Sequence, residues 1–145
     1  MRVEFQRLDP DVVLPRRARD GDAGVDLAAN AEFRVGPGGR AMVPTGLAVA
    51  IPPGHAGLVL PRSGLASRHG LTLANAPGLI DAGYRGEITV AVVNLDRERA
   101  VEIRRGDRIA QLLVIPFVLV DPMEVEELPP SERGTGGFGS SGVRS

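Results

Sequence analysis

The sequence predicts a small all-β protein, a sandwich or a barrel, folded as a single domain. Short runs rich in Val, Ile and Leu are separated by turn residues along most of the 145-residue chain, which contains 19 Gly and 12 Pro. No long stretch has helical periodicity. A domain of this length can bury its own hydrophobic core, so the sequence does not require a second domain.

Four apolar runs give the strand predictions, and tetrapeptides rich in glycine and proline give the turns. The expected strands lie within residues 42–52 (MVPTGLAVAIP), 57–61 (GLVLP), 86–95 (GEITVAVVNL) and 108–120 (RIAQLLVIPFVLV). The expected turns are residues 36–39 (GPGG), 52–55 (PPGH), 75–78 (NAPG) and 104–107 (RRGD). Such a succession of short strands and turns is typical of small sandwiches and barrels.

One short segment, SGLASRH at residues 63–69, predicts a helix instead of a strand. Ser63 can cap its first turn and Gly70 can end its last turn. After about residue 120 the composition changes to a polar stretch with prolines and then to a glycine-rich end. We therefore expect a β-barrel domain over residues 1–120, a connector over residues 121–132 and a flexible tail over residues 133–145.

The composition excludes several classes of chemistry. All 17 basic residues are Arg, so a phosphate loop that depends on lysine is excluded, and the absence of Cys excludes disulfides and thiol catalysis. The net charge of −1 gives no field that would attract nucleic acid or anionic lipid. The longest uncharged run contains four prolines, and the N-terminal residues lack the apolar core of a signal peptide. These features predict a soluble cytoplasmic protein that binds neither nucleic acid nor membrane directly.

The densest candidate for a functional site is GLIDAGYRGEI, residues 78–88, which contains Asp81 and the only tyrosine, Tyr84. An aspartate at a turn usually accepts hydrogen bonds from nearby backbone amides. The functional alternative is a carboxylate held on a tight hairpin as a general base. The residues of this segment leave both interpretations open.

Three further side chains have both a structural and a functional interpretation. Arg62 and Ser63 in PRSGLA form either an anion site at a helix start or an ordinary helix cap. Asp26, flanked by apolar residues as on a strand, belongs either to a solvated acidic turn or to a hydrated Mg²⁺ site near phosphates. Gln111 lies in an apolar run, so its amide either bonds the backbone or faces a ligand.

Taken together, five segments resemble the ordered motifs of the trimeric deoxyuridine triphosphatase (dUTPase) family. They are AGVDL at residues 23–27, PRSGLA at 61–66, GLIDAGYRGE at 78–87, RIAQL at 108–112 and RGTGGFGSSG at 133–142. The motifs occur in family order from near the N-terminus to the tail, so the resemblance extends over nearly the whole chain. One departure is Ser141, where threonine is common in the family, and the hydroxyl is retained.

The resemblance implies a distorted jelly-roll β-barrel, or β-clip, with one short helix, assembled as a homotrimer. Three active sites would lie between the subunits. Each site would hydrolyse dUTP to dUMP and pyrophosphate, with Mg²⁺ bound to the triphosphate. This activity would limit uracil incorporation into DNA and supply dUMP for thymidylate synthesis.

The resemblance also implies a role for each matching residue. Asp81 would be the base that activates water, and Asp26 would hold the metal through its water shell. The triphosphate would be bound by Arg62, Ser63, the amide of Gly64 and Gln111. Uracil would be read by Asn75 and by the hairpin that includes Leu79, Ile80 and Thr89, with Tyr84 packed under the sugar. In the tail, Arg133 would contact the terminal phosphates and Phe138 would stack on uracil over a neighbouring subunit's site.

The same residues support two rival functions less well. A dCTP deaminase of the same fold would carry a catalytic glutamate where this chain has Ala91. A trimer that only binds nucleotides or a protein partner would be expected to lack Asp81, Arg133 or the aromatic residue Phe138, and this chain keeps all three.

Overall fold

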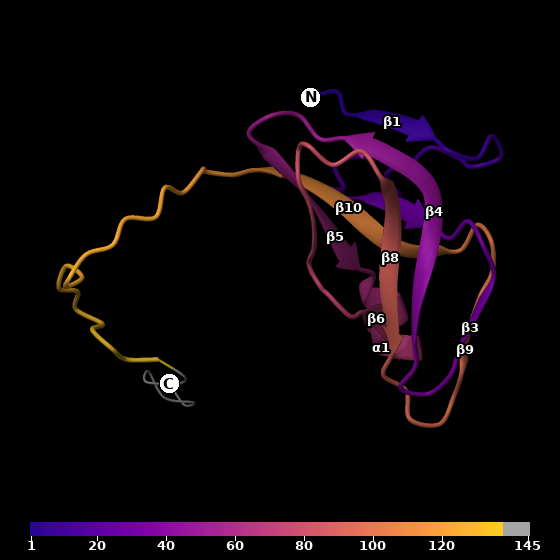
Figure 1. Cartoon of the computed structure of the whole chain (residues 1–145). Coiled ribbons are helices and arrows are strands. Elements are labelled where there is room, and N and C mark those ends of the chain that lie inside the picture. The colour runs from indigo at the N-terminus through magenta and orange to yellow at the C-terminus, as the bar shows by residue number, and fades with distance from the viewer. Residues whose placement is uncertain (138–145) are drawn as a thin grey trace.

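The computed structural model describes residues 1–137, which form ten strands and one short helix (Figure 1). The elements are β1 (Glu4–Arg7), β2 (Val25–Ala28), β3 (Phe33–Val35), β4 (Arg40–Ala50), β5 (His55–Pro61), α1 (Ser63–His69), β6 (Leu71–Leu73), β7 (Gly78–Ile80), β8 (Glu87–Asn94), β9 (Val101–Ile103) and β10 (Arg108–Pro116). The predicted all-β class with one short helix is therefore confirmed. No helix among residues 1–137 is long and apolar enough to cross a membrane.

The strands pair antiparallel in three sheets, with the orders β1-β4-β8-β6, β2-β10-β5-β7 and β3-β9. Within residues 1–137, no pairing joins these sheets into one closed barrel. All four long apolar runs of the sequence form strands, namely β4, β5, β8 and β10. Their β-branched and leucine side chains fit a pleated surface with at least one buried face.

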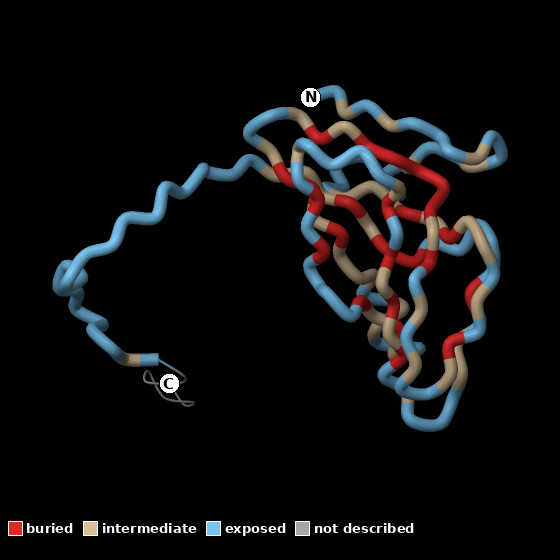
Figure 2. The backbone as a smooth tube through the Cα atoms, viewed as in Figure 1, coloured by how far each residue is buried: buried red, intermediate tan, exposed pale blue. Residues whose placement is uncertain are grey.

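The core lies between the two four-stranded sheets and follows the period-2 alternation of the strands. In β8, the side chains of Ile88, Val90 and Val92 are buried, whereas Thr89 between them is exposed. Leu27 of β2 and Leu112 of β10 bury their side chains in the same cluster. Figure 2 shows the buried positions within the packed strands.

Helix α1 differs from the sequence prediction at its N-terminus and agrees with it at its C-terminus. Ser63 is the first helical residue, the N-cap is Arg62, and no side chain caps the helix. The prediction that Ser63 caps α1 is therefore wrong. Gly70 ends the helix as predicted. Its backbone φ is 65°, a value that residues with a side chain rarely adopt. A β-carbon at Gly70 would also lie 2.7 Å from the amide nitrogen of Asp96.

The segment around Asp81 is not a tight hairpin, which corrects the second local prediction. Strand β7 pairs with β5, whereas β8 pairs with β4 and β6. The chain therefore crosses from one four-stranded sheet to the other between Ile80 and Glu87. Asp81 and Tyr84 lie in this crossover, which is exposed because neither sheet covers it.

The chain beyond β10 leaves the packed body. The strand ends at Pro116, four residues before the end of the apolar run that predicted it. Residues 117–137 form no helix or strand and extend away from the sheets (Figures 1 and 2). Val118 and Leu119 are each 85% exposed, although their side chains are apolar.

Candidate active site

The predicted site residues other than Arg133 and Phe138 line two separate cavities. One cavity of about 560 Å³, here called the Arg62 cavity, is lined by Asp26, Arg62, Ser63, Gly64 and Gln111, among others. The other, of about 400 Å³ and here called the Asp81 cavity, is lined by Asn75, Leu79, Ile80, Asp81, Tyr84 and Thr89, among others. Among residues 1–137, no residue lines both cavities. A single chain thus divides the predicted site into two halves.

The Arg62 cavity is built where three neighbouring strands bring distant residues together. Asp26 on β2 lies opposite Gln111 on β10, and Gln111 lies opposite Leu60 on β5. Arg62 follows the end of β5, so its guanidinium reaches the Asp26 carboxylate, with 3.1 Å between Nε and Oδ1. The amide of Gln111 also closes this wall, because its Nε2 donates to the carbonyl oxygen of Pro61 at 3.1 Å.

A second arginine completes this charged cluster. Nη1 of Arg108 donates to Oδ2 of Asp26 at 2.9 Å, and the Arg108 carbonyl accepts a 2.9 Å hydrogen bond from Arg62. The Asp26 side chain is only 17% exposed, so its charge lies partly out of water between two guanidinium groups. Charge-assisted pairs of this kind are stronger than neutral hydrogen bonds and fix the geometry of the arginines.

The Asp81 cavity has a different character, because apolar side chains and backbone form most of its wall. The buried side chains of Val59, Ile80 and Val90 line it from the two sheets. Tyr84 is 46% exposed, and its hydroxyl donates to the carbonyl oxygen of Glu87 at 3.0 Å. A narrow apolar pocket with a few polar groups at its edge is typical of a small-molecule site.

Among the described residues after β10, 117–137, none lines either cavity. Arg133 lines neither of them, and its Nε donates locally to the carbonyl oxygen of Gly136 at 2.7 Å. Phe138, the predicted stacking residue, lies outside the described residues.

Comparisons with known proteins decide the family. A family profile described as dUTPase matches residues 11–142. A deoxyuridine 5'-triphosphate nucleotidohydrolase from Mycolicibacterium gilvum is 57% identical over 141 residues, covering 94% of this chain and 92% of that protein. The chain belongs to the dUTPase family. This membership confirms the family and the enzyme class that the five motifs predict.

Solved structures of dUTPases agree with the fold. A mutant dUTPase of Staphylococcus bacteriophage 80alpha with dUpNHpp has a TM-score of 0.90 and 30% identity, covering 98% of this chain and 99% of that chain. A mutant dUTPase from phage phi11 of S. aureus, solved for the coordination of a structural Mg(II) ion, has a TM-score of 0.81 and 26% identity, covering 88% and 98% of the two chains.

Among residues 1–137, the side chains of one chain build no metal site on their own. Within residues 1–137, no group of three or more His, Cys, Asp and Glu side chains could hold an ion. Both carboxylate oxygens of Asp26 accept from arginines. A divalent cation prefers several oxygen ligands and, for Mg²⁺, keeps much of its water. These donors therefore fit an ion carried by a polyphosphate and contacted through water, and they do not fit direct coordination.

Sequence reasoning missed Arg108 as part of this dUTPase's charged cluster. The RIAQL motif drew attention to Gln111, yet the first residue of the same motif makes the ion pair with Asp26. Alternation along the strand could not have found it, because strict alternation places Arg108 and Gln111 on opposite faces. The register of β10 against β2 shifts between Arg108 and Ala110, and this shift accompanies the contact of Arg108 with Asp26.

Proposed function

We propose that the chain hydrolyses dUTP to dUMP and pyrophosphate, with the phosphates bound in the Arg62 cavity and the nucleoside in the Asp81 cavity. The observation that carries this proposal is the division of the predicted residues. Arg62 and Arg68 line one cavity, and the pocket of apolar and backbone groups with a carboxylate at its edge forms the other. A nucleoside triphosphate has the same two-part chemistry.

In this proposal the Arg62 cavity neutralises and places the triphosphate. Arg62, Ser63, the Gly64 amide and Gln111 bind the phosphate oxygens. Arg62 is already held by Asp26, so less rotational freedom is lost when substrate binds. In phosphoryl transfer, placement and charge stabilisation provide most of the catalysis, and fixed guanidinium groups supply both.

The Asp81 cavity selects the nucleoside and carries the base. Asn75 and the backbone around Leu79, Ile80 and Thr89 read uracil, while the Tyr84 ring packs under the deoxyribose and leaves no space for a 2′-hydroxyl. The Asp81 carboxylate accepts a proton from water as the water oxygen bonds to the α-phosphorus. The bond from that phosphorus to the bridging oxygen breaks, and pyrophosphate leaves with the electron pair.

Mg²⁺ is part of the substrate in this proposal, bound to the triphosphate oxygens. When bound there, it neutralises phosphate charge. Asp26 contacts the hydrated ion through water while its carboxylate keeps the two arginines in place. The absence of a protein-built site among residues 1–137 supports an ion that arrives with the nucleotide.

We also propose a homotrimer in which neighbouring subunits join the two cavities into one site. Two observations support it: the cavities share no residue within a chain, and residues 117–137 carry exposed apolar side chains away from their own body. The tail, residues 133–145, would act as a lid on another subunit's site, with Arg133 on the terminal phosphates and Phe138 on uracil. Residues 1–120 would form the catalytic domain and residues 121–132 the connector.

In the cell, such an enzyme would keep dUTP out of DNA synthesis and provide dUMP for thymidylate. The rival deaminase activity is disfavoured by one position. Ala91 lines the Asp81 cavity, so the methyl group of alanine stands where a deaminase would need a proton-transferring carboxylate.

The test is pyrophosphate release in the presence of Mg²⁺ from dUTP, dCTP, dTTP and UTP in parallel, with ammonia release from dCTP measured alongside. We expect release from dUTP alone. Sedimentation equilibrium of the same sample should give the mass of three chains. A folded protein that releases no pyrophosphate from dUTP, or releases ammonia from dCTP, would contradict the proposed reaction. A monomeric mass with full activity would contradict the shared site.

A further inference from the structure

The Asp81 carboxylate is positioned by its backbone. Among residues 1–137, no side chain makes a hydrogen bond or an ion pair with this carboxylate. Residues 81–84, here called the Asp81 turn, are closed by the amide of Tyr84, which donates to the Asp81 carbonyl at 3.0 Å. The direction of the Asp81 side chain therefore depends on the conformation of this turn.

One side chain closes the turn from outside the cavity. Nη1 of Arg85 donates to the carbonyl oxygens of both Ala82 and Tyr84, each at 2.7 Å. These carbonyls lie on either side of the exposed Gly83, so a single guanidinium nitrogen holds the two ends of the bend together. Arg85 itself does not line the Asp81 cavity.

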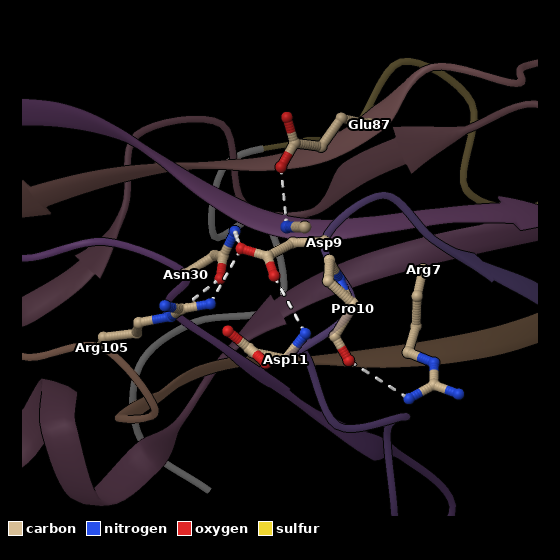
Figure 3. Close-up of polar contacts among 8 residues, drawn as sticks. Arg7, Asp9, Pro10, Asp11, Asn30, Glu87 and Arg105 are labelled. Carbon is tan, nitrogen blue, oxygen red and sulfur yellow. Dashed lines mark hydrogen bonds and ion pairs between the residues drawn. The ribbon is translucent and has the colours of Figure 1, made fainter.

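The Asp81 turn is also attached to the sheet that contains β4 and β8. The Tyr84 hydroxyl donates to the carbonyl oxygen of Glu87. The Glu87 carboxylate in turn accepts a 2.7 Å hydrogen bond from a backbone amide of β4, that of Gly46, and Figure 3 shows this contact at Glu87. Gly86 permits this arrangement, because a β-carbon there would overlap the Tyr84 hydroxyl. The position of the turn relative to the core is thus defined at one end, and Arg85 defines its internal shape.

We propose that Arg85 is a positioning residue that holds the Asp81 turn in the conformation required for catalysis. The inference rests on the proposed function, in which Asp81 is the base. Arg85 acts through the backbone of Ala82 and Tyr84 and does not touch the nucleotide. It sets the direction of the Asp81 carboxylate and the position of the Tyr84 ring together, because both belong to the same turn.

The test compares Arg85→Ala and Arg85→Lys with the intact protein, and with Arg97→Ala as the matched loss of an exposed arginine. Arg97 makes no side-chain hydrogen bond or ion pair among the described residues and lines neither cavity. Three quantities are measured: kcat for dUTP, the affinity for dUpNHpp by titration calorimetry, and hydrogen exchange of the Tyr84 amide.

We expect Arg85→Ala to lower kcat by about 10- to 100-fold, since small displacements of a catalytic group have effects of this size. Affinity for dUpNHpp should fall by much less than kcat, because the Tyr84 hydroxyl keeps its own hydrogen bond to Glu87. The thermal unfolding midpoint should stay near that of Arg97→Ala. Exchange of the Tyr84 amide should become roughly tenfold faster, because two hydrogen bonds from a charged donor are lost. Arg85→Lys, which can still donate to both carbonyls, should recover part of kcat and part of the protection.

Unchanged kcat in Arg85→Ala would overturn the proposal. So would a fall in kcat that only matches the fraction of unfolded protein, because that result makes Arg85 a stabilising residue alone. Hydrogen exchange of the Tyr84 amide is measured without any enzymatic turnover. It therefore tests the role of Arg85 separately from the proposed hydrolysis of dUTP. If the intact protein hydrolyses no dUTP, the proposed function fails, while an unchanged Tyr84 amide in Arg85→Ala would still show that Arg85 does not hold the turn.

Discussion

The two cavities are held in place by different forces. At the Arg62 cavity, charged side chains position one another: Asp26 of the cavity wall pairs with Arg62 and with the neighbouring Arg108. In the Asp81 cavity, backbone hydrogen bonds and the missing side chain of Gly86 set the geometry. If both cavities serve the proposed hydrolysis, one half depends on side-chain charge and the other on main-chain conformation. The two halves should then respond to different substitutions.

The largest effect should come from Asp81, the proposed base. Asp81→Asn keeps the size of the side chain and removes the base, so we expect kcat for dUTP to fall on the order of 10³-fold. Affinity for dUpNHpp and the unfolding midpoint should stay close to those of the intact protein, because no described side chain bonds this carboxylate. Steady-state kinetics with calorimetry checks both, and near-full turnover would remove Asp81 from the mechanism.

Breaking the charged cluster tests the other half. Asp26→Ala leaves Arg62 and Arg108 without their shared partner, so both side chains gain freedom. We expect kcat/KM for dUTP to fall roughly 10- to 100-fold, the range for lost charge-assisted contacts. Affinity for deoxyuridine, which has no phosphate, should not change.

Asp20→Ala is the matched control, since Asp20 is exposed and lines neither cavity. Equal losses of affinity for deoxyuridine and dUTP in Asp26→Ala would mean that the two halves are not independent.

A backbone change should act only on the nucleoside half. Gly86→Ala introduces a methyl group that overlaps the Tyr84 hydroxyl, so the ring must move. We expect kcat/KM for dUTP to fall about tenfold and the ratio of UTP to dUTP hydrolysis to rise. The control is Gly36→Ala, where a β-carbon meets no atom within 4 Å. An unchanged ratio would show that the position of Tyr84 does not determine sugar selectivity.

The smallest effect lies away from both cavities and concerns stability alone. The amide of Asp11, followed by Asn30 and Arg105, lowers the pKa of Asp9 below its usual value of 3.8. Asp9 also pairs with Arg105 at 2.8 Å (Figure 3). A carboxyl group whose pKa is lower in the folded state stabilises the fold at pH values above its pKa in the unfolded chain. This stabilisation is lost as the pH falls through its pKa in the folded state.

Asp9→Asn should therefore flatten the loss of stability in acid, as measured by urea unfolding between neutral pH and about pH 2.5. Activity at neutral pH should stay unchanged. Asp20→Asn is the control, and an equal flattening in that variant would show that the effect does not come from the contacts of Asp9.

The sequence predicted what depends on local pattern. Long apolar runs became β4, β5, β8 and β10, and Gly70 ended α1 because only its conformation suits that position. Strands of three residues, such as β3 and β9, were missed, since three residues are too few for an alternation to be recognised. Ser63 was expected to cap a helix that it instead begins, a difference of one residue at a boundary.

Long-range geometry could not be predicted in the same way. The pairing of Arg108 with Asp26 joins residues 82 positions apart and depends on the register of β10 against β2, which shifts between Arg108 and Ala110. The crossover at Asp81 was taken for a hairpin, because the sequence between two strands does not say whether they pair with each other. The motifs predicted which residues belong to the site, whereas the order of the strands in the sheets determines which of the two cavities each residue lines.

The absence of a shared residue between the two cavities has a genetic consequence. If each site takes one cavity from each of two subunits, Arg62→Ala chains and Asp81→Asn chains are defective in different halves. Mixed assemblies then contain sites in which both contributed cavities are intact. Two inactive alleles would therefore complement each other when expressed together, and refolding the two purified variants as a mixture should restore dUTP hydrolysis that neither has alone.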